Sequence, residues 1–370
     1  MKRSSFLILT AIGAFVSLAF FLNFSPVDAQ ASKPVSGKAS VQPTPPDTAK
    51  VTPTPPKIKE EEEIYKVDTE LVNLNVRVID RNNRPVNGLT QNDFKIFEDS
   101  ESQRIEFFSK SEVPTNYALV IDNSGSLRPQ LEKVIEASKV IVATNRPDDE
   151  TSIIRFVSRD KITIEQPFTA NKVDLNDALD NLYIEGGQTA IIDAVYLAAE
   201  KVSEYEKARG QDDRKRRALV IVSDGEDRDS YYNEAQLFEL LRETDVQIYA
   251  IGFVGDLSKE AGFIAKSPQG KAKAFLQRLA TETGGKAYFP KDVGELSALA
   301  KDIGSELRVQ YSIGYIPSND RKDGTFRNIK VAIDDGPNKQ KRIAITKTGR
   351  TADGSGTPGQ GSSQVKPPNK

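Results

Sequence analysis

Two short, wholly apolar runs that end in polar residues constrain the fold of this chain more than any other feature. Residues 117–121 lead directly into Asp122, and residues 218–222 lead into Ser223 and Asp224. A strand is apolar at every position only when both of its faces are covered, as in a parallel sheet between two layers of helices. The two runs therefore predict buried parallel strands whose carboxyl ends carry polar side chains.

Helical and extended segments alternate around these two runs. The spacing predicts helices over 127–144, 172–182, 190–205, 233–243, 271–283 and 293–307, and further strands over 151–157, 161–168 and 246–253. The strands at 151–157 and 161–168 are too close in sequence for a crossover, so we expect a hairpin. The pattern predicts one α/β domain over 113–310, with a doubly wound, mainly parallel sheet. Ligands of such sheets bind beyond the carboxyl ends of the strands, where the strand order reverses.

Two flanking segments, 64–112 and 311–350, show the alternating apolar and polar residues of half-buried strands. Each is too short to form a sheet of normal size on its own, and isolated hairpins are marginally stable in water. We therefore expect the two flanks to pair as one small antiparallel β domain into which the α/β domain is inserted.

Oxygen-bearing side chains gather at the predicted strand ends. Asp122, Ser124 and Ser126 alternate along the chain, which directs their side chains to one side of an extended segment. Thr189 and Asp224 lie downstream in comparable positions. Each residue has an ordinary local role as a helix cap or turn former, but together they offer the hard oxygen ligands that suit Mg²⁺, Mn²⁺ or Ca²⁺. The set is a candidate cation site.

In order and spacing, these five residues closely resemble the metal-ion-dependent adhesion site (MIDAS) of the von Willebrand factor A (VWA) family, which has a Rossmann-like fold. The resemblance implies that all five hold a divalent cation, most often Mg²⁺, directly or through water. It also implies that an Asp or Glu of a protein partner supplies the last ligand. We expect Gly125 to permit the tight turn, and Gly186 and Gly187 to let the Thr189 loop approach closely.

The flanks are similar to those of bacterial "VWFA-related" exported proteins. The similarity is carried by residues 86–94, 98–99, 315–317 and 323–327. With the cation site it spans about residues 65–350.

Composition excludes several kinds of catalysis. The chain has no His and no Cys, which removes the commonest general base, thiol chemistry and the usual zinc ligands. Residues 265–272 do not complete a phosphate-binding loop, and Ser124 stands where phosphoaspartate enzymes carry a second Asp. We therefore expect a non-enzymatic protein-binding module for adhesion or complex assembly. The alternatives are a structural cell-envelope scaffold with a purely structural ion and, less favoured, a metal-dependent hydrolase.

Charge does not indicate a nucleic-acid partner. The net charge is −2, and the basic residues of 209–217 are mixed with acids and lack interleaved aromatic residues. We expect this cluster to be a solvated loop. Residues 255–270 follow a predicted strand on the same side as the cation site. They are a candidate contact for the partner, and local packing is the equal alternative.

The N-terminal segment predicts export. A basic start, the apolar stretch 6–24 and the small-x-small run 27–29 are typical of a signal peptide over 1–29, and the stretch is long enough to leave an uncleaved membrane anchor open. We expect a secreted, periplasmic or cell-envelope protein. Residues 30–63, rich in Pro and Thr, predict a disordered linker, and residues 351–370 predict a disordered tail.

Overall fold

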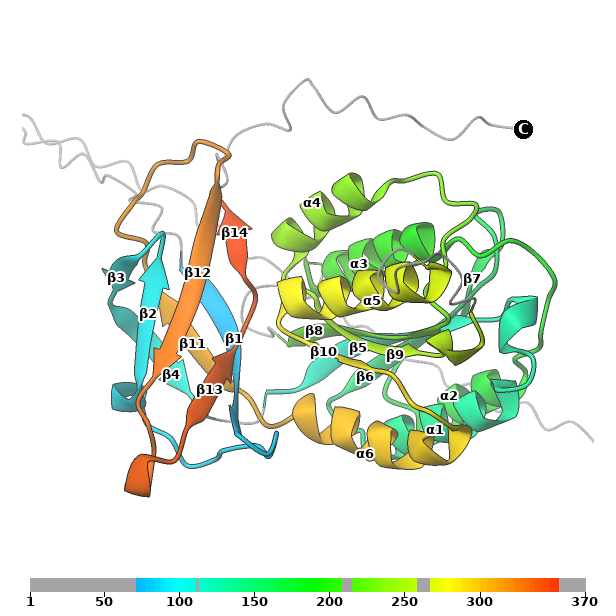
Figure 1. The fold of residues 1–370 in the computed structure, drawn as a ribbon, viewed down its shortest axis with the longest axis horizontal. Coiled ribbons are helices and arrows are strands. Elements are labelled where there is room, and N and C mark those ends of the chain that lie inside the picture. Colours follow the sequence, from blue (N-terminus) through cyan, green and yellow to red (C-terminus); the bar gives the residue numbers. More distant parts are fainter. Residues whose placement is uncertain (1–70, 111–112, 208–214, 258–266, 353–370) are drawn as a thin grey trace, which may run out of the picture. The chain divides into compact units, whose positions relative to one another are not determined.

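The computed structural model describes residues 71–352, apart from 111–112, 208–214 and 258–266 (Figure 1). The predicted signal peptide and linker lie outside the described residues, as do most of the basic cluster and most of segment 255–270. Within the part that is described, no helix is both long and apolar enough to cross a membrane.

The α/β domain contains a six-stranded sheet with the order β10-β9-β8-β5-β6-β7. All neighbours are parallel except β7, which forms the predicted antiparallel hairpin with β6. This confirms the doubly wound, mainly parallel sheet. The strands are β5 Thr115–Asp122, β6 Glu150–Phe156, β7 Ile162–Thr169, β8 Arg216–Ser223, β9 Gln247–Gly252 and β10 Lys286–Tyr288.

Helices cover both faces of this sheet (Figure 1). Alternate residues of β5 point to opposite sides: Tyr117 and Leu119 pack with α1, α2 and α6, whereas Ala118 and Val120 pack with α3, α4 and α5. The apolar run of β5 is thus explained by two separate cores. The helices are α1 Leu131–Ala143, α2 Lys172–Asp180, α3 Ile191–Lys207, α4 Glu234–Thr244, α5 Pro268–Thr283 and α6 Leu296–Glu306.

Three helices begin three or four residues from the predicted start. Helix α6 starts at Leu296 rather than residue 293, because a 3-10 helix over Val293–Glu295 precedes it. The helix expected from residue 127 starts at Leu131, because the short 3-10 helix η2 Gly125–Leu127 precedes it. Helix α5 starts at Pro268 rather than Lys271, with the Ser267 side chain accepting a hydrogen bond from the Gly270 N–H. Proline is favourable in the first helical turn, where its missing N–H has no partner to lose. Further 3-10 helices are η1 Gln91–Asp93, η4 Val254–Asp256, η6 Val293–Glu295 and η7 Pro337–Lys339.

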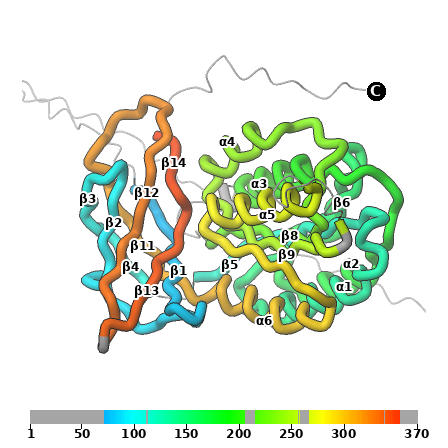
Figure 2. Tube along the Cα trace, viewed as in Figure 1, coloured from blue at the N-terminus to red at the C-terminus, as the bar shows by residue number. Residues whose placement is uncertain are grey.

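The flanks form a β domain of two four-stranded sheets, with orders β13-β1-β11-β4 and β14-β12-β2-β3. Figure 2 shows how strands from the two ends of the sequence interleave within it. All pairings are antiparallel, and both sheets mix strands from before and after the α/β domain, as predicted. The strands are β1 Val72–Asp80, β2 Phe94–Glu98, β3 Glu101–Gln103, β4 Ile105–Ser109, β11 Tyr311–Tyr315, β12 Phe326–Ile333, β13 Arg342–Ile345 and β14 Gly349–Thr351.

The last strand corrects the predicted start of the tail at residue 351. Thr351 pairs with Phe326, and Ala352 is buried and donates its N–H to the Thr325 carbonyl at 3.0 Å. The flanking domain therefore extends at least to Ala352. The short strand escaped prediction because a three-residue segment containing Gly shows no period.

Buried polar contacts join the β domain to the α/β domain. Arg77 of β1 donates from Nη1 to both carboxylate oxygens of Glu306 at 2.6 Å, and both side chains are at most 5% exposed. Lys286 also reaches Glu306, at 3.0 Å. Two cations thus neutralise this buried carboxylate, as a charge out of water requires.

Candidate metal centre

All five predicted ligands lie at the carboxyl edge of the central sheet. Strands β5 and β8 are parallel neighbours in which Ile121 pairs with Val222, so Asp122 and Asp224 emerge side by side. The strand order reverses between these two strands, because β5 is followed in sequence by β6 on its other side. Thr189, on the loop before α3, is brought to the same place by a hydrogen bond of 2.8 Å from the Arg228 N–H to its carbonyl.

The two carboxylates are buried and have no cationic partner. Asp122 is 0% exposed and Asp224 is 4% exposed, and no ion pair to either is recorded among the described residues. Ser124 and Thr189 are also buried, whereas Ser126 is exposed. Buried charges in proteins are paired or coordinate metals. The exposure of Ser126 shows which side of the site opens to solvent.

Burial raises the pKa of Asp122 to about 6. Hydrogen bonds from Ser124 and Ser223 oppose this shift, and the nearby charge of Asp224 adds to it. A divalent cation between the two aspartates would stabilise both charged forms and reverse the shift.

The Asp122 carboxylate is held by two hydrogen bonds. The Ser124 N–H donates to Oδ1 at 2.9 Å, and the Ser223 hydroxyl donates to Oδ2 at 2.8 Å. Ser223 in turn accepts from the Gly225 N–H at 3.0 Å. The hydroxyls of Ser124 and Ser126 lie 2.9 Å apart, so these two alternating side chains face each other. Ser223, which sequence reasoning missed, therefore links the loops after β5 and β8.

Asn123 joins the loop after β5 to the Thr189 loop. Its Nδ2 donates to the Tyr183 carbonyl at 2.7 Å, and its own carbonyl accepts from the Glu185 N–H at 2.9 Å. The Oδ1 atom of Asn123 is buried without a hydrogen-bond donor among the described residues.

A network of ion pairs connects the loop that precedes Thr189 to strand β6. Arg155 of β6 contacts Glu165 and Glu185 at 2.7 Å each, and its guanidinium lies 4.8 Å from the centre of the Tyr183 ring. Lys161 also contacts Glu185, at 2.6 Å. Glu185 is therefore fixed from two sides, four residues before Thr189.

Of the three glycines predicted to be sterically required, the structure supports one. A Cβ on Gly187 would lie 2.6 Å from Val157 Cγ1, so the close approach of this loop is confirmed. Gly125 and Gly186 have no atom within 4 Å of such a Cβ, so no steric need for glycine exists there. Gly225 is the glycine that the backbone requires, since its φ is +79° and a Cβ would lie 2.9 Å from Leu276.

The donor set fits a hard cation. No group of three or more Asp, Glu, His or Cys residues suited to a metal occurs in the described part of the chain. The site instead combines two carboxylates with three hydroxyls, which are the oxygen ligands that Mg²⁺, Mn²⁺ and Ca²⁺ accept.

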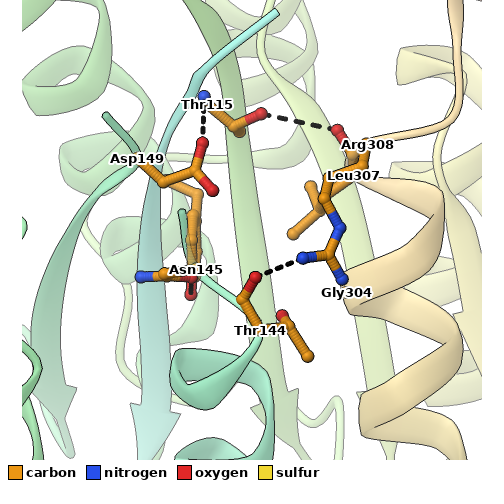
Figure 3. Close-up of a pocket in the computed structure, with 8 residues that line it drawn as sticks. Thr115, Thr144, Asn145, Asp149, Gly304, Leu307 and Arg308 are labelled. Carbon is orange, nitrogen blue, oxygen red and sulfur yellow. Dashed lines mark hydrogen bonds between the residues drawn. The ribbon is translucent and has the colours of Figure 1, made fainter. Parts of the chain in front are cut away.

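A cavity at the opposite end of β5 is not a comparable site (Figure 3). Its volume is about 10 Å³, which is room for roughly one water molecule. Its polar groups already pair with one another: the Thr115 N–H donates to Asp149 Oδ1 at 2.8 Å, and Arg308 donates to the Thr144 carbonyl.

Comparison with known proteins agrees with this architecture. The family model for the von Willebrand factor type A domain matches residues 116–302. An uncharacterised protein of Synechocystis (sll0103) is 36% identical over 115 residues, which are 31% of this chain and 26% of the relative; the chain thus matches about a quarter of its length.

Solved structures that resemble the chain have low sequence identity. A von Willebrand factor type A protein from Catenulispora acidiphila is 13% identical, with a TM-score of 0.43, over 69% of this chain and 73% of its own. Proximal thread matrix protein 1 of the mussel byssus, solved with a zinc-occupied MIDAS motif, is 19% identical, with a TM-score of 0.42, over 53% and 48%. The family match itself takes in more than half of the chain and includes all five predicted ligands. The chain belongs to the von Willebrand factor type A domain family.

Proposed function

We propose that the chain is an exported module that binds a protein partner through a divalent cation held by Asp122, Ser124, Ser126, Thr189 and Asp224. Mg²⁺ is the expected ion, with Mn²⁺ and Ca²⁺ as alternatives. Five side chains leave a position open in octahedral coordination, and an Asp or Glu carboxylate of the partner would complete both the geometry and the charge.

One observation carries this proposal: two buried carboxylates lie close together, and no cationic side chain of the described residues pairs with either. Single buried carboxylates elsewhere are satisfied in other ways: Glu306 is neutralised by Arg77 and Lys286, and Asp149 and Asp193 each accept two backbone N–H hydrogen bonds. The contrast supports a cation as the missing partner at the sheet edge. The exposed Ser126 gives the partner a direction of approach.

The proposed module acts by binding, without catalysis. A chain without His or Cys has no residue of the two types that most often serve as general base or thiol nucleophile. The carboxylates at the site are engaged by Ser124, Ser223 and the Glu226 N–H, which hold them as ligands.

Calorimetry tests the cation site. Asp122→Ala removes one of the two carboxylates, so we expect it to abolish Mg²⁺ and Mn²⁺ binding while the fold persists, because the site lies outside both cores. Asp148→Ala is the matched control, since Asp148 is exposed in the loop before β6 at the other end of the sheet. Undiminished binding by Asp122→Ala would overturn the assignment.

Affinity capture from the native cell envelope, with and without EDTA, tests the mode of binding. A reversible, cation-dependent module releases its partner when the ion is chelated, and Asp122→Ala captures none. A permanent scaffold with a structural ion retains its partner in EDTA. Fractionation of the tagged full chain into cytoplasmic and exported fractions tests the compartment.

A further inference from the structure

A groove of about 310 Å³ adjoins the loop that carries Asp224. One side of the groove is formed by Gly225 to Arg228, directly after Asp224, and the other by the first turns of α4 and α5. It is much larger than the cavity of Figure 3. It lies next to the edge of the sheet that carries the candidate cation site, because residues 225–228 directly follow Asp224.

The groove and the metal centre share their walls. The Arg228 N–H donates to the Thr189 carbonyl at 2.8 Å, and the Ile192 N–H donates to Asp227 Oδ1 at 3.2 Å. The segment after Asp224 therefore lines the groove and is also hydrogen-bonded to Thr189, so it connects the groove with the proposed ligands Thr189 and Asp224. A chain that placed a carboxylate on the cation would continue over this groove within a few residues.

The floor of the groove is apolar. Ile192, Ala272 and Phe275 line it, and each belongs to the core between the sheet and helices α3 to α5. Their fractional exposures of 7%, 3% and 8% show that these side chains are packed in that core and present only a small surface to the groove. Such a floor suits a single apolar side chain, because burying it removes apolar area from water without disturbing the fold.

The charged side chains that line the groove differ in whether they have a partner. Glu226 pairs with Arg228, Glu234 pairs with Arg278 at 3.2 Å, and Asp227 accepts hydrogen bonds from Ile192 and the Ser230 hydroxyl. Each acidic side chain in the lining thus has an ion-pair or hydrogen-bond partner, although the partners of Asp227 in the described residues are neutral donors.

Lys271 is the exception. It is exposed, no ion pair to it is recorded among the described residues, and the first turn of α5 contains no acidic residue. Among the described residues, the groove lining therefore contains one cation, Lys271, and one anion, Asp227, that take part in no ion pair, beside an apolar floor.

We propose that the partner segment which supplies the metal carboxylate also places an apolar side chain in this groove and a second carboxylate against Lys271. The inference rests on the proposed function and specifies its ligand as an acidic segment with two carboxylates that bracket an apolar residue. The cation anchors the first carboxylate, and Lys271 selects for the second.

A peptide library tests this recognition directly. The probe is a set of 12-residue peptides with a fixed central Asp and randomised flanks, selected on the wild-type protein in Mg²⁺ and in EDTA. We expect Mg²⁺-dependent enrichment of an apolar residue followed by a second Asp or Glu on one side of the fixed Asp.

Lys271→Glu is the decisive variant, and Lys273→Glu is its matched control. Lys273 lies two residues along the same exposed turn, over the Phe289 ring, and does not line the groove. We expect Lys271→Glu to weaken the enriched peptides about five- to tenfold and to bind better the versions with Lys in place of the second acid. Lys273→Glu should change neither, and both variants should bind Mg²⁺ like the wild type.

The outcomes separate the two proposals. Mg²⁺-dependent enrichment without a flanking preference, or with equal effects of Lys271→Glu and Lys273→Glu, overturns the groove and leaves the cation-dependent function standing. Selection that is the same in Mg²⁺ and EDTA overturns the proposed function and the groove inference together.

Discussion

Asp122 illustrates how a proposed cation ligand can lower the stability of the ion-free protein. Its carboxylate is fully buried, accepts two hydrogen bonds and faces a second aspartate. Without an ion, the charged form is disfavoured in the folded state relative to the unfolded chain. Sites that are strained until a ligand binds are a common source of trade-off between function and stability.

We expect Asp122→Asn to stabilise the ion-free protein at pH 7. The folded pKa of Asp122 is raised from 3.8 to about 6, so the folded state binds the proton more tightly than the unfolded state. The contribution of this residue to stability is therefore greatest below pH 3.8 and is lost as the pH rises to 6. Removing the charge should add up to ~3 kcal/mol at pH 7, at about 1.4 kcal/mol per pKa unit.

Urea unfolding in EDTA at pH 7 and at pH 3.5 measures this effect. The advantage of Asp122→Asn should vanish at the lower pH, where the wild-type carboxyl is protonated in both states. Excess Mg²⁺ should stabilise the wild type alone. A variant less stable than the wild type in EDTA at pH 7 would contradict this account.

Ser223→Ala should weaken cation binding without altering the ligands themselves. The substitution removes the hydrogen bond to Asp122 Oδ2 and the acceptor of the Gly225 N–H. Losing such an outer hydrogen bond typically reduces metal affinity about 10- to 100-fold. Ser203→Ala is the control, because Ser203 is a buried serine of α3 whose hydroxyl has no recorded partner in the described residues. Equal Mg²⁺ affinities of the two variants by calorimetry would refute the role of Ser223.

The position of the candidate ligands at the strand ends could be predicted at this scale, and the residues that support them could not. Asp122, Ser124 and Ser126 follow one another along the chain, so alternation alone showed that they converge. The contacts of Ser223 and Asn123 span about 100 and 60 positions in sequence and exist only after the strands and loops have assembled. Gly225 was missed because a positive φ after a strand leaves no periodic signal.

At the scale of elements, the Thr189 loop depends on a neighbouring strand for its position. Arg155 projects from β6, the strand beside β5, and fixes Glu185 together with Lys161. The loop is therefore attached to the sheet on which Asp122 lies. We expect this attachment to hold the Thr189 loop at a fixed distance from Asp122.

We expect Arg155→Met to lower Mg²⁺ affinity about tenfold, because Glu185 and the Thr189 loop lose their support from the sheet. Glu185→Gln should have a similar effect, and the double variant should add little, since both changes remove one interaction. Calorimetric Mg²⁺ titrations of the two single variants and the double variant measure the coupling free energy between Arg155 and Glu185.

Lys139→Met is the control for that cycle. It removes a surface ion pair with Asp180, at 2.5 Å, away from the metal rim. Surface pairs contribute little, about 0–1 kcal/mol, so this variant should keep the wild-type affinity. Additive losses in the Arg155 and Glu185 cycle would contradict a shared role.

Element prediction succeeded where segments were long and periodic. The strands of the α/β domain and its helices show clear apolar periods, and the hairpin of β6 and β7 followed from the short connection alone. Three-residue strands such as β10 and β14 depend on backbone pairing with neighbours, as Lys286 pairs with Tyr249. Sequence periodicity cannot report a partner that is distant in the chain.

At the scale of the whole molecule, the β domain is built from both ends of the described chain. The pairing of the flanks was predicted from their insufficient size, but their division into two sheets was not. Two facing sheets require side chains of Ile96 on β2 and Ile313 on β11 to share one core, and alternation along single strands does not show which strands face each other.

Deleting residues 1–110 should therefore cause aggregation. The deletion removes β1 to β4, which exposes the edges and apolar faces of β11 and β12. Truncation after Ala352 is the control and should leave a soluble monomer, because the described sheets end there. Size-exclusion chromatography and circular dichroism decide the result. A soluble, monomeric fragment of residues 111–352 with native strand content would show that the C-terminal flank folds without the N-terminal flank.

The pairing of Ser109 with Ser312 has a mechanical consequence. The polypeptide enters the α/β domain just after one of these residues and leaves it just before the other, at a single rung of the ladder between β4 and β11. A stretching force applied between Val72 and Thr351 would be borne by the interstrand hydrogen bonds of the β domain. The α/β domain would lie outside that line of tension, and its candidate cation site would bear no load until the pairing between Ser109 and Ser312 ruptured.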